Sequence, residues 1–167
     1  MRTVASLMLV FSSLLAVLFA APAPAAAAAG KARMDGTERH ILRAINHQRS
    51  SHGLSRIGAS RRLARAADYH SSQMLTYDFF AHDSRDGSPF DRRVRRFARH
   101  RAVGETLAML GGGCGRGSAR RFVGMWMNSP GHRAILLSSG FGRVGIGKRV
   151  GSLGSGRACV VTADFGG

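Results

Sequence analysis

Apolar residues recur at helical spacing through the first part of the chain. Ile41, Leu42 and Ile45 would lie on one face of a helix. Asp35 and Glu38 precede this face in the pattern of a capping box, in which each side chain bonds the backbone of the other residue. The spacing therefore predicts a helix that begins after Asp35.

A second helix is predicted after Ser60, which is a favourable N-cap residue. Its apolar face would consist of Leu63, Ala66, Ala67, His70 and Met74. His70 falls on the packed side, where we interpret it as a core histidine with a satisfied hydrogen bond. A role as a ligand stays open, because imidazole is a common metal ligand.

Two further helices are predicted in the middle of the chain. Residues 91–101 place Val94 and Phe97 on one side and arginines on the rest. The next helix begins near Ser118 and turns Phe122, Val123 and Trp126 inward. Pro130 and Gly131 should break it, so His132 is expected directly after a helix end.

The last third of the chain changes to strand patterns. Residues 141–150 alternate around glycines, and residues 158–165 are apolar and β-branched. A glycine- and serine-rich turn over residues 151–156 would join them as a hairpin. Helices followed by a terminal hairpin predict an α+β domain built in layers.

Residues 1–29 have the composition of a secretory signal peptide. Arg2 precedes an apolar run from Val4 to Ala21, and alanines at 25, 27 and 29 offer cleavage sites. Residues 30–37 would be a short linker and residues 38–167 the domain. The alternative is an uncleaved membrane anchor, because the run is nearly long enough to span a bilayer. We expect export, to the periplasm or the exterior, and no transmembrane helix in the mature chain.

The sequence is strongly basic, with 25 Lys and Arg against 9 Asp and Glu. Such a surface favours anionic partners. For an exported protein we expect anionic cell-envelope material, and no nucleic acid, because no recognised nucleic-acid-binding motif is present. The arginines from Arg92 to Arg101 are the candidate basic patch, with a solvated helix face as the simpler alternative.

Cys114 and Cys159 are the two cysteines. An even number of cysteines in an exported chain predicts a disulfide. Two buried free thiols are the alternative. A cysteine metal site is not expected, because the chain lacks C-x-x-C spacing.

Four ordered motifs resemble those of the CAP superfamily, the cysteine-rich secretory, antigen 5 and pathogenesis-related 1 proteins. They cover residues 38–167, and the similarity is greatest to short secreted bacterial members. In chain order the motifs are Asn46-His47-Gln48-Arg49, His82-Asp83-Ser84-Arg85-Asp86-Gly87-Ser88, Gly104-Glu105-Thr106-Leu107-Ala108 and Trp126-Met127-Asn128-Ser129-Pro130-Gly131-His132-Arg133.

The resemblance implies a three-layer α-β-α sandwich with a cleft lined by two histidines and two acidic residues. His82, Glu105 and His132 match three of these positions. Ser129 stands where eukaryotic members have the second glutamate. Two imidazoles and a carboxylate can hold zinc, but the missing acid should weaken metal binding and removes one participant from a two-acid mechanism.

We therefore expect a non-catalytic binding module. Its cleft, formed by His82, Glu105, His132 and Ser129, would take a small ligand, either a lipid or an envelope component, or a weakly held divalent cation such as zinc. The alternative is a zinc-assisted hydrolase with His82 and His132 as metal ligands and Glu105 as base. A second alternative is a basic adhesin for anionic envelope surfaces.

Overall fold

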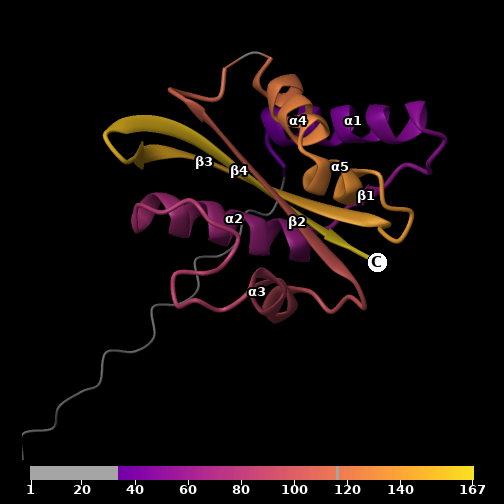
Figure 1. Ribbon diagram of the computed structural model, residues 1–167, viewed down its shortest axis with the longest axis horizontal. Helices are drawn as coiled ribbons and strands as arrows, with labels where there is room; N and C mark the ends of the chain where they lie inside the picture. Colours follow the sequence, from indigo (N-terminus) through magenta and orange to yellow (C-terminus); the bar gives the residue numbers. More distant parts are fainter. Residues whose placement is uncertain (1–33, 116) are drawn as a thin grey trace, which may run out of the picture.

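The computed structural model describes residues 34–115 and 117–167. Within these residues, five helices and four strands form three layers, with α1, α4 and α5 on one face of the sheet and α2 and α3 on the other (Figure 1). In chain order the elements are α1 (Gly36–Ser51), β1 (Gly58–Ala59), α2 (Arg61–Thr76), α3 (Phe90–Phe97), β2 (Val103–Gly111), α4 (Ser118–Asn128), α5 (Pro130–Leu136), β3 (Arg143–Leu153) and β4 (Gly156–Gly166). The expected α-β-α sandwich is confirmed.

The predicted helix starts are confirmed by their caps. The backbone N–H of Asp35 donates to the Glu38 carboxylate at 2.7 Å, and the N–H of Glu38 donates to Asp35 at 2.9 Å. Ser60 accepts from the N–H of Leu63 at 3.4 Å and caps α2. These side chains supply partners for donors that a helix leaves unsatisfied at its start.

The predicted position of His132 after a helix end is wrong. Helix α4 ends at Asn128, Ser129 adopts an extended backbone, and Pro130 begins the separate helix α5. Proline fits the first helical position because the N–H that it lacks would have no partner there. His132 therefore lies in the first turn of α5, where the helix fixes the direction of its side chain.

The sheet has the order β1-β3-β4-β2, with β4 antiparallel to both neighbours. The predicted hairpin is confirmed as β3 and β4. Strand β3 begins and ends later than expected, and β4 extends beyond the expected range at both ends. The segment that carries Glu105 proves to be β2, a strand that the apolar pattern did not reveal. Its register pairs Glu105 with Asp164 of β4.

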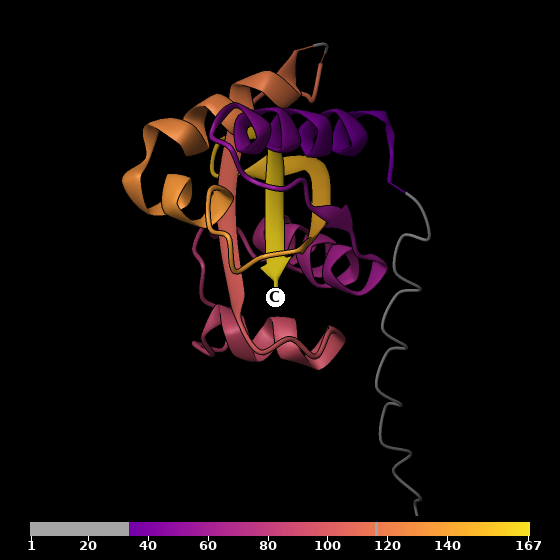
Figure 2. The same cartoon turned by 90° about the vertical axis from the view of Figure 1, so that its right-hand side faces the viewer.

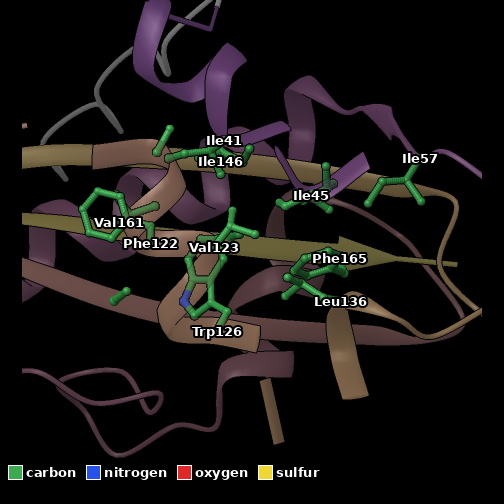
Figure 3. Packing of buried hydrophobic residues seen from close by; sticks show 14 of the residues in the cluster. Ile41, Ile45, Ile57, Phe122, Val123, Trp126, Leu136, Ile146, Val161 and Phe165 are labelled. Atoms are coloured by element: carbon green, nitrogen blue, oxygen red, sulfur yellow. The ribbon is translucent and has the colours of Figure 1, made fainter. Parts of the chain in front are cut away.

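Alternate residues of β4 face two different layers. Cys159, Val161, Ala163 and Phe165 pack with α1, α4 and α5 in the larger apolar cluster (Figure 3). Trp126 lies at the centre of that cluster, fully buried, and its indole N–H donates to the carbonyl of Leu107 at 2.9 Å. The in-between residues, which include Thr162 and Asp164, face α2 and α3.

Helix α2 lies unusually close to β3. A Cβ atom added to Gly145 would come within 1.9 Å of the backbone of Ala64, and one added to Gly147 would come within 2.1 Å of the backbone of Asp68. Only glycine allows this approach. The Ser71 hydroxyl bonds the carbonyl of Gly147 at 3.0 Å across the same contact.

Cys114 and Cys159 form the predicted disulfide, with their Cα atoms 5.5 Å apart. The bond joins the loop after β2 to the central strand β4. It bridges 45 positions of the chain, so it restricts the unfolded state substantially.

The predicted signal peptide over residues 1–29 and most of the linker over residues 30–37 lie outside the described residues. In residues 34–115 and 117–167, no helix has the length and apolar character needed to cross a membrane.

Candidate functional site

His82 and His132 meet at the edge of the sheet. Strand β2 is the edge strand, with α5 on one side of it and α3 on the other (Figures 1 and 2). His82 lies in the loop that precedes α3, and His132 lies on α5. Their ring centroids are 5.6 Å apart, so the two imidazoles predicted to share a site are brought together.

The carboxylate of Glu105 forms a hydrogen bond with the imidazole ring of His82. The Nδ1 atom of His82 lies 2.8 Å from the Oε1 atom of Glu105, and the carboxylate is buried while the His82 side chain is 45% exposed. When Nδ1 carries the proton and donates to the carboxylate, Nε2 is left with a lone pair. Glu105 therefore fixes both the orientation and the tautomer of His82.

Arg93 binds the second oxygen of Glu105. Its Nη2 atom forms an ion pair with Oε2, and its Nη1 atom donates to the carbonyl of His82 at 3.0 Å. Arg93 is 1% exposed, so the interpretation of every arginine in 92–101 as part of a solvated face is wrong. Arg93 lies on the same stripe of α3 as Phe90 and Phe97, and this spacing is the signal that could have identified it.

Asp164 is the acid that sequence reasoning missed. It is fully buried on β4 opposite Glu105, and no donor in the part of the chain that the structure describes reaches its oxygens. Glu105 is its cross-strand neighbour, and two buried acids placed together are tolerated only when at least one of them is protonated. A lone acid in an otherwise apolar strand is itself a signal, because a buried charge needs a partner.

Burial disfavours the ionised form of both carboxyl groups, Glu105 and Asp164. Burial, opposed by the Arg93 guanidinium, raises the pKa of Glu105 to about 7. Burial and then the charge of Glu105 raise the pKa of Asp164 well above its usual value. One arginine thus faces two acids, and we assign the retained proton to Asp164, because Glu105 has both Arg93 and His82 as partners.

Both cleft imidazoles favour the neutral form. Burial and the nearby Arg93 lower the pKa of His82, and burial and His82 lower the pKa of His132. At neutral pH the pair therefore presents uncharged ring nitrogens at a partly exposed surface.

The arrangement limits the chemistry of Glu105. One oxygen is engaged by His82 and the other by Arg93. The side chain of Glu105 is also fully buried, so acting as a metal ligand or as a base for water would require the site to open. In the described ranges, no three His, Cys, Asp or Glu side chains are grouped to hold a metal ion.

Ser129, the fourth predicted cleft residue, lies half-buried between α4 and α5. Its N–H donates to the carbonyl of Trp126 at 3.2 Å, and its carbonyl accepts from the N–H of Arg133 at 2.8 Å. These bonds give its backbone a role in the junction. A role of its hydroxyl in a cleft stays a prediction.

Three other predicted polar residues are structural. The Nε2 atom of His70 bonds the carbonyl of Ala81 at 2.8 Å, and burial lowers the pKa of His70 to about 3. Asn46 exchanges two bonds with the backbone of Ile57. Arg49 donates to carbonyls of Ser55, Leu136, Ser138 and Phe141.

The Bacillus subtilis (strain 168) protein YkwD is 30% identical over 111 residues, which are 66% of this chain and 41% of YkwD. The membrane protein YlbC of the same organism is 33% identical over 112 residues, which are 66% of this chain and 31% of YlbC. The chain thus spans well under half the length of these curated relatives.

Solved structures show the same fold. An extracellular SCP-domain protein from Bacillus anthracis superposes with a TM-score of 0.64 and 26% identity, over 78% of this chain and 40% of that one. An outer surface protein of Borrelia burgdorferi also gives 0.64, with 18% identity, over 78% of this chain and 91% of that one. The model of the cysteine-rich secretory protein family matches residues 42–165. The chain belongs to this family, the CAP family.

Proposed function

We propose that this chain is an exported CAP-domain binding module without catalytic activity, and that His82 and His132 form its polar recognition point. The observation that carries the proposal is the 5.6 Å separation of two neutral imidazoles at an accessible edge of the domain. Export is supported by the extracellular relative and the disulfide.

A weakly held divalent cation is the simplest ligand for this pair. Zinc–nitrogen bonds are about 2 Å long, so rings at this separation can approach one ion. The carboxylate behind His82 resembles the second layer of many metal sites, where a carboxylate orients the ligating histidine. Two protein ligands and the nearby Arg93 cation predict weak binding that water completes.

Zinc titration by isothermal calorimetry tests this proposal. His132→Ala should remove the strongest binding event, and Glu105→Gln should weaken it by loosening His82. His52→Ala is the matched control, because His52 is exposed at the end of α1. Equal zinc binding by the wild type and His132→Ala would refute the site. Tight zinc binding with metal-dependent hydrolysis would instead favour the hydrolase.

A lipid is a second candidate ligand, and a separate groove favours it. A cavity of about 780 Å³ lies between α1 and α4, with Ala44, Ala119 and Val123 among its apolar lining residues. Arg43 and Arg120 also line this groove. An apolar lining beside two cations suits an acyl chain with an anionic head.

Extraction of the purified exported protein, followed by mass spectrometry, would identify such a lipid. Gly124 lines the groove and has open space where a side chain would start. Gly124→Leu should therefore fill the groove and reduce lipid uptake, whereas Gly124→Ala, which adds one methyl group, should retain it. Unchanged uptake by the leucine variant would exclude the groove.

A further inference from the structure

A different cavity lies on the α2 face, and neither His82 nor His132 is among its lining residues. It has a volume of about 390 Å³ and lies between α2, the 82–88 loop and α3. Cavities of this size are at the small end of those that hold small molecules. The lining is polar and aromatic, with two arginines, two tyrosines, a glutamine and a serine among its residues.

Two cations from separate elements meet at this cavity. Arg85 comes from the loop and Arg96 from α3. The guanidinium of Arg85 lies 4.0 Å above the ring centroid of Tyr77, so aromatic stacking orients it. Asp86 also lines the cavity, but its Oδ1 atom accepts from the N–H and hydroxyl of Ser88. The cavity therefore retains one net positive charge.

The wall offers partners for hydroxyl groups. Gln73 and Ser84 line it with an amide and a hydroxyl. His70, which is fully buried, forms part of the wall and donates from Nε2 to Ala81. Its Nδ1 atom is then an acceptor, and no donor in residues 34–115 and 117–167 satisfies it. Because Nδ1 is shielded from solvent, the partners that the wall offers to a ligand hydroxyl are Gln73 and Ser84.

Tyr69 and Tyr77 supply apolar surface at the same place. The two residues are 42% and 43% exposed, so part of each aromatic side chain is accessible from solvent. Flat aromatic surface beside amide, hydroxyl and guanidinium groups matches a pyranose ring, which has apolar C–H faces and a polar edge. A simple anion such as phosphate would engage the arginines and leave the tyrosines and Gln73 unused.

We propose that this cavity binds one ring of an acidic saccharide, with its carboxylate held by Arg85 and Arg96 and its hydroxyls by Gln73 and Ser84. Guanidinium groups recognise carboxylates through paired charge-assisted hydrogen bonds. The site requires neither His82 nor His132, so it can be tested independently of the function proposed above.

Glucuronic acid is the probe, titrated into the purified exported protein and followed by NMR and calorimetry. Arg96→Gln should weaken binding by about tenfold or more, because a charge-assisted hydrogen bond is lost. Arg99→Gln is the matched control, since Arg99 is exposed beyond the end of α3 and does not line the cavity. His132→Ala should bind glucuronic acid like the wild type.

Two comparison ligands decide the class of molecule. Glucose lacks the carboxylate and should bind at least about tenfold more weakly, and Gln73→Ala should weaken glucuronic acid without affecting inorganic phosphate. Absence of glucuronic acid binding by the wild type, or equal binding by Arg96→Gln, would overturn the proposal. Phosphate binding as tight as that of glucuronic acid would show an anion site without saccharide recognition and would also overturn it.

Discussion

The two faces of the sheet are stabilised by different physics. The face toward α1, α4 and α5 is a continuous apolar cluster around Trp126. The face toward α2 and α3 contains smaller apolar groups and, between them, buried polar residues such as Ser71, Arg93 and Glu105. An apolar layer depends on shape and volume, whereas buried polar groups depend on the protonation of their partners. The candidate site is built on the second face and reaches around the edge strand to the first.

The largest loss of stability is expected from Trp126→Ala, because it creates a cavity in the apolar face. Such truncations cost about 3 to 5 kcal/mol, and here the carbonyl of Leu107 also loses its partner. The free energy of unfolding, measured by denaturant titration, should fall by a similar amount at pH 5 and pH 8. Met125→Ala is the control, because Met125 is exposed on the same helix. A loss below about 1 kcal/mol would contradict the central role of this indole.

Arg93→Met should cost nearly as much, but only at high pH. Removing one partner of a buried ion pair costs about 3 to 5 kcal/mol, because the other charge is left uncompensated. At pH 5 Glu105 can take up a proton instead, so the loss in the free energy of unfolding should shrink. Arg92→Met, at the exposed neighbouring position, should be nearly silent at both values. A loss that is the same at pH 5 and pH 8 would refute the electrostatic description of this face.

Asp164→Asn should stabilise the folded state at pH 8. Folded Glu105 keeps its proton up to about pH 7, whereas the unfolded chain releases it near 4.5. The folded state binds more protons in this window, so the free energy of unfolding of the wild type falls as pH rises from 4.5 to 7.

Asp164 adds to this decline, because burial and the charge of Glu105 hold its own pKa well above the usual value. An amide at position 164 cannot ionise, so the part of the decline that comes from Asp164 should disappear and the curve should flatten. The gain at pH 8 should be about 2 kcal/mol at most, since one pKa unit corresponds to about 1.4 kcal/mol. Denaturant titrations of both proteins at intervals from pH 5 to 8 measure it. Parallel curves would show that the pKa of Asp164 is not raised in the folded state.

The smallest effect is expected from Ser71→Ala. The Ser71 hydroxyl bonds Thr162 at 2.9 Å and the carbonyl of Gly147 at 3.0 Å. Losing it should cost about 1 kcal/mol, the usual net value for a hydrogen bond. Ser72→Ala, one position along and only half-buried, is the control in thermal unfolding. If Ser72→Ala lowered the melting temperature more than Ser71→Ala, the stabilising role of the Ser71 hydrogen bonds would be contradicted.

Local chemistry made much of the fold predictable. Asp35, Glu38 and Ser60 identify helix starts because capping acts within a few residues. The hairpin was visible because alternation and a glycine-rich turn lie close together. Strand β2 could not be predicted, because most of its residues are buried on both faces and therefore show no alternation of apolar and polar residues.

The site was only half visible in the sequence, for a related reason. His82 and His132 lie 50 positions apart and were paired by the family motifs, not by spacing. Asp164 was missed because its partner lies across a strand pairing with Glu105 that no local pattern encodes. Arg93 was hidden among other arginines, although its place on the apolar stripe of α3 distinguished it.

The position of β4 in the chain has a consequence for how the protein is made. β4 is central in the sheet and follows every other strand in sequence. Before it emerges from the ribosome, the only strand pairing available among the described residues is the two-residue contact of β1 with β3. Without β4, Cys114 also lacks its partner. The sheet and the disulfide therefore cannot form until almost all of the domain has been synthesised. This late closure would suit the export proposed above, because a chain that has not yet folded can pass through a narrow channel.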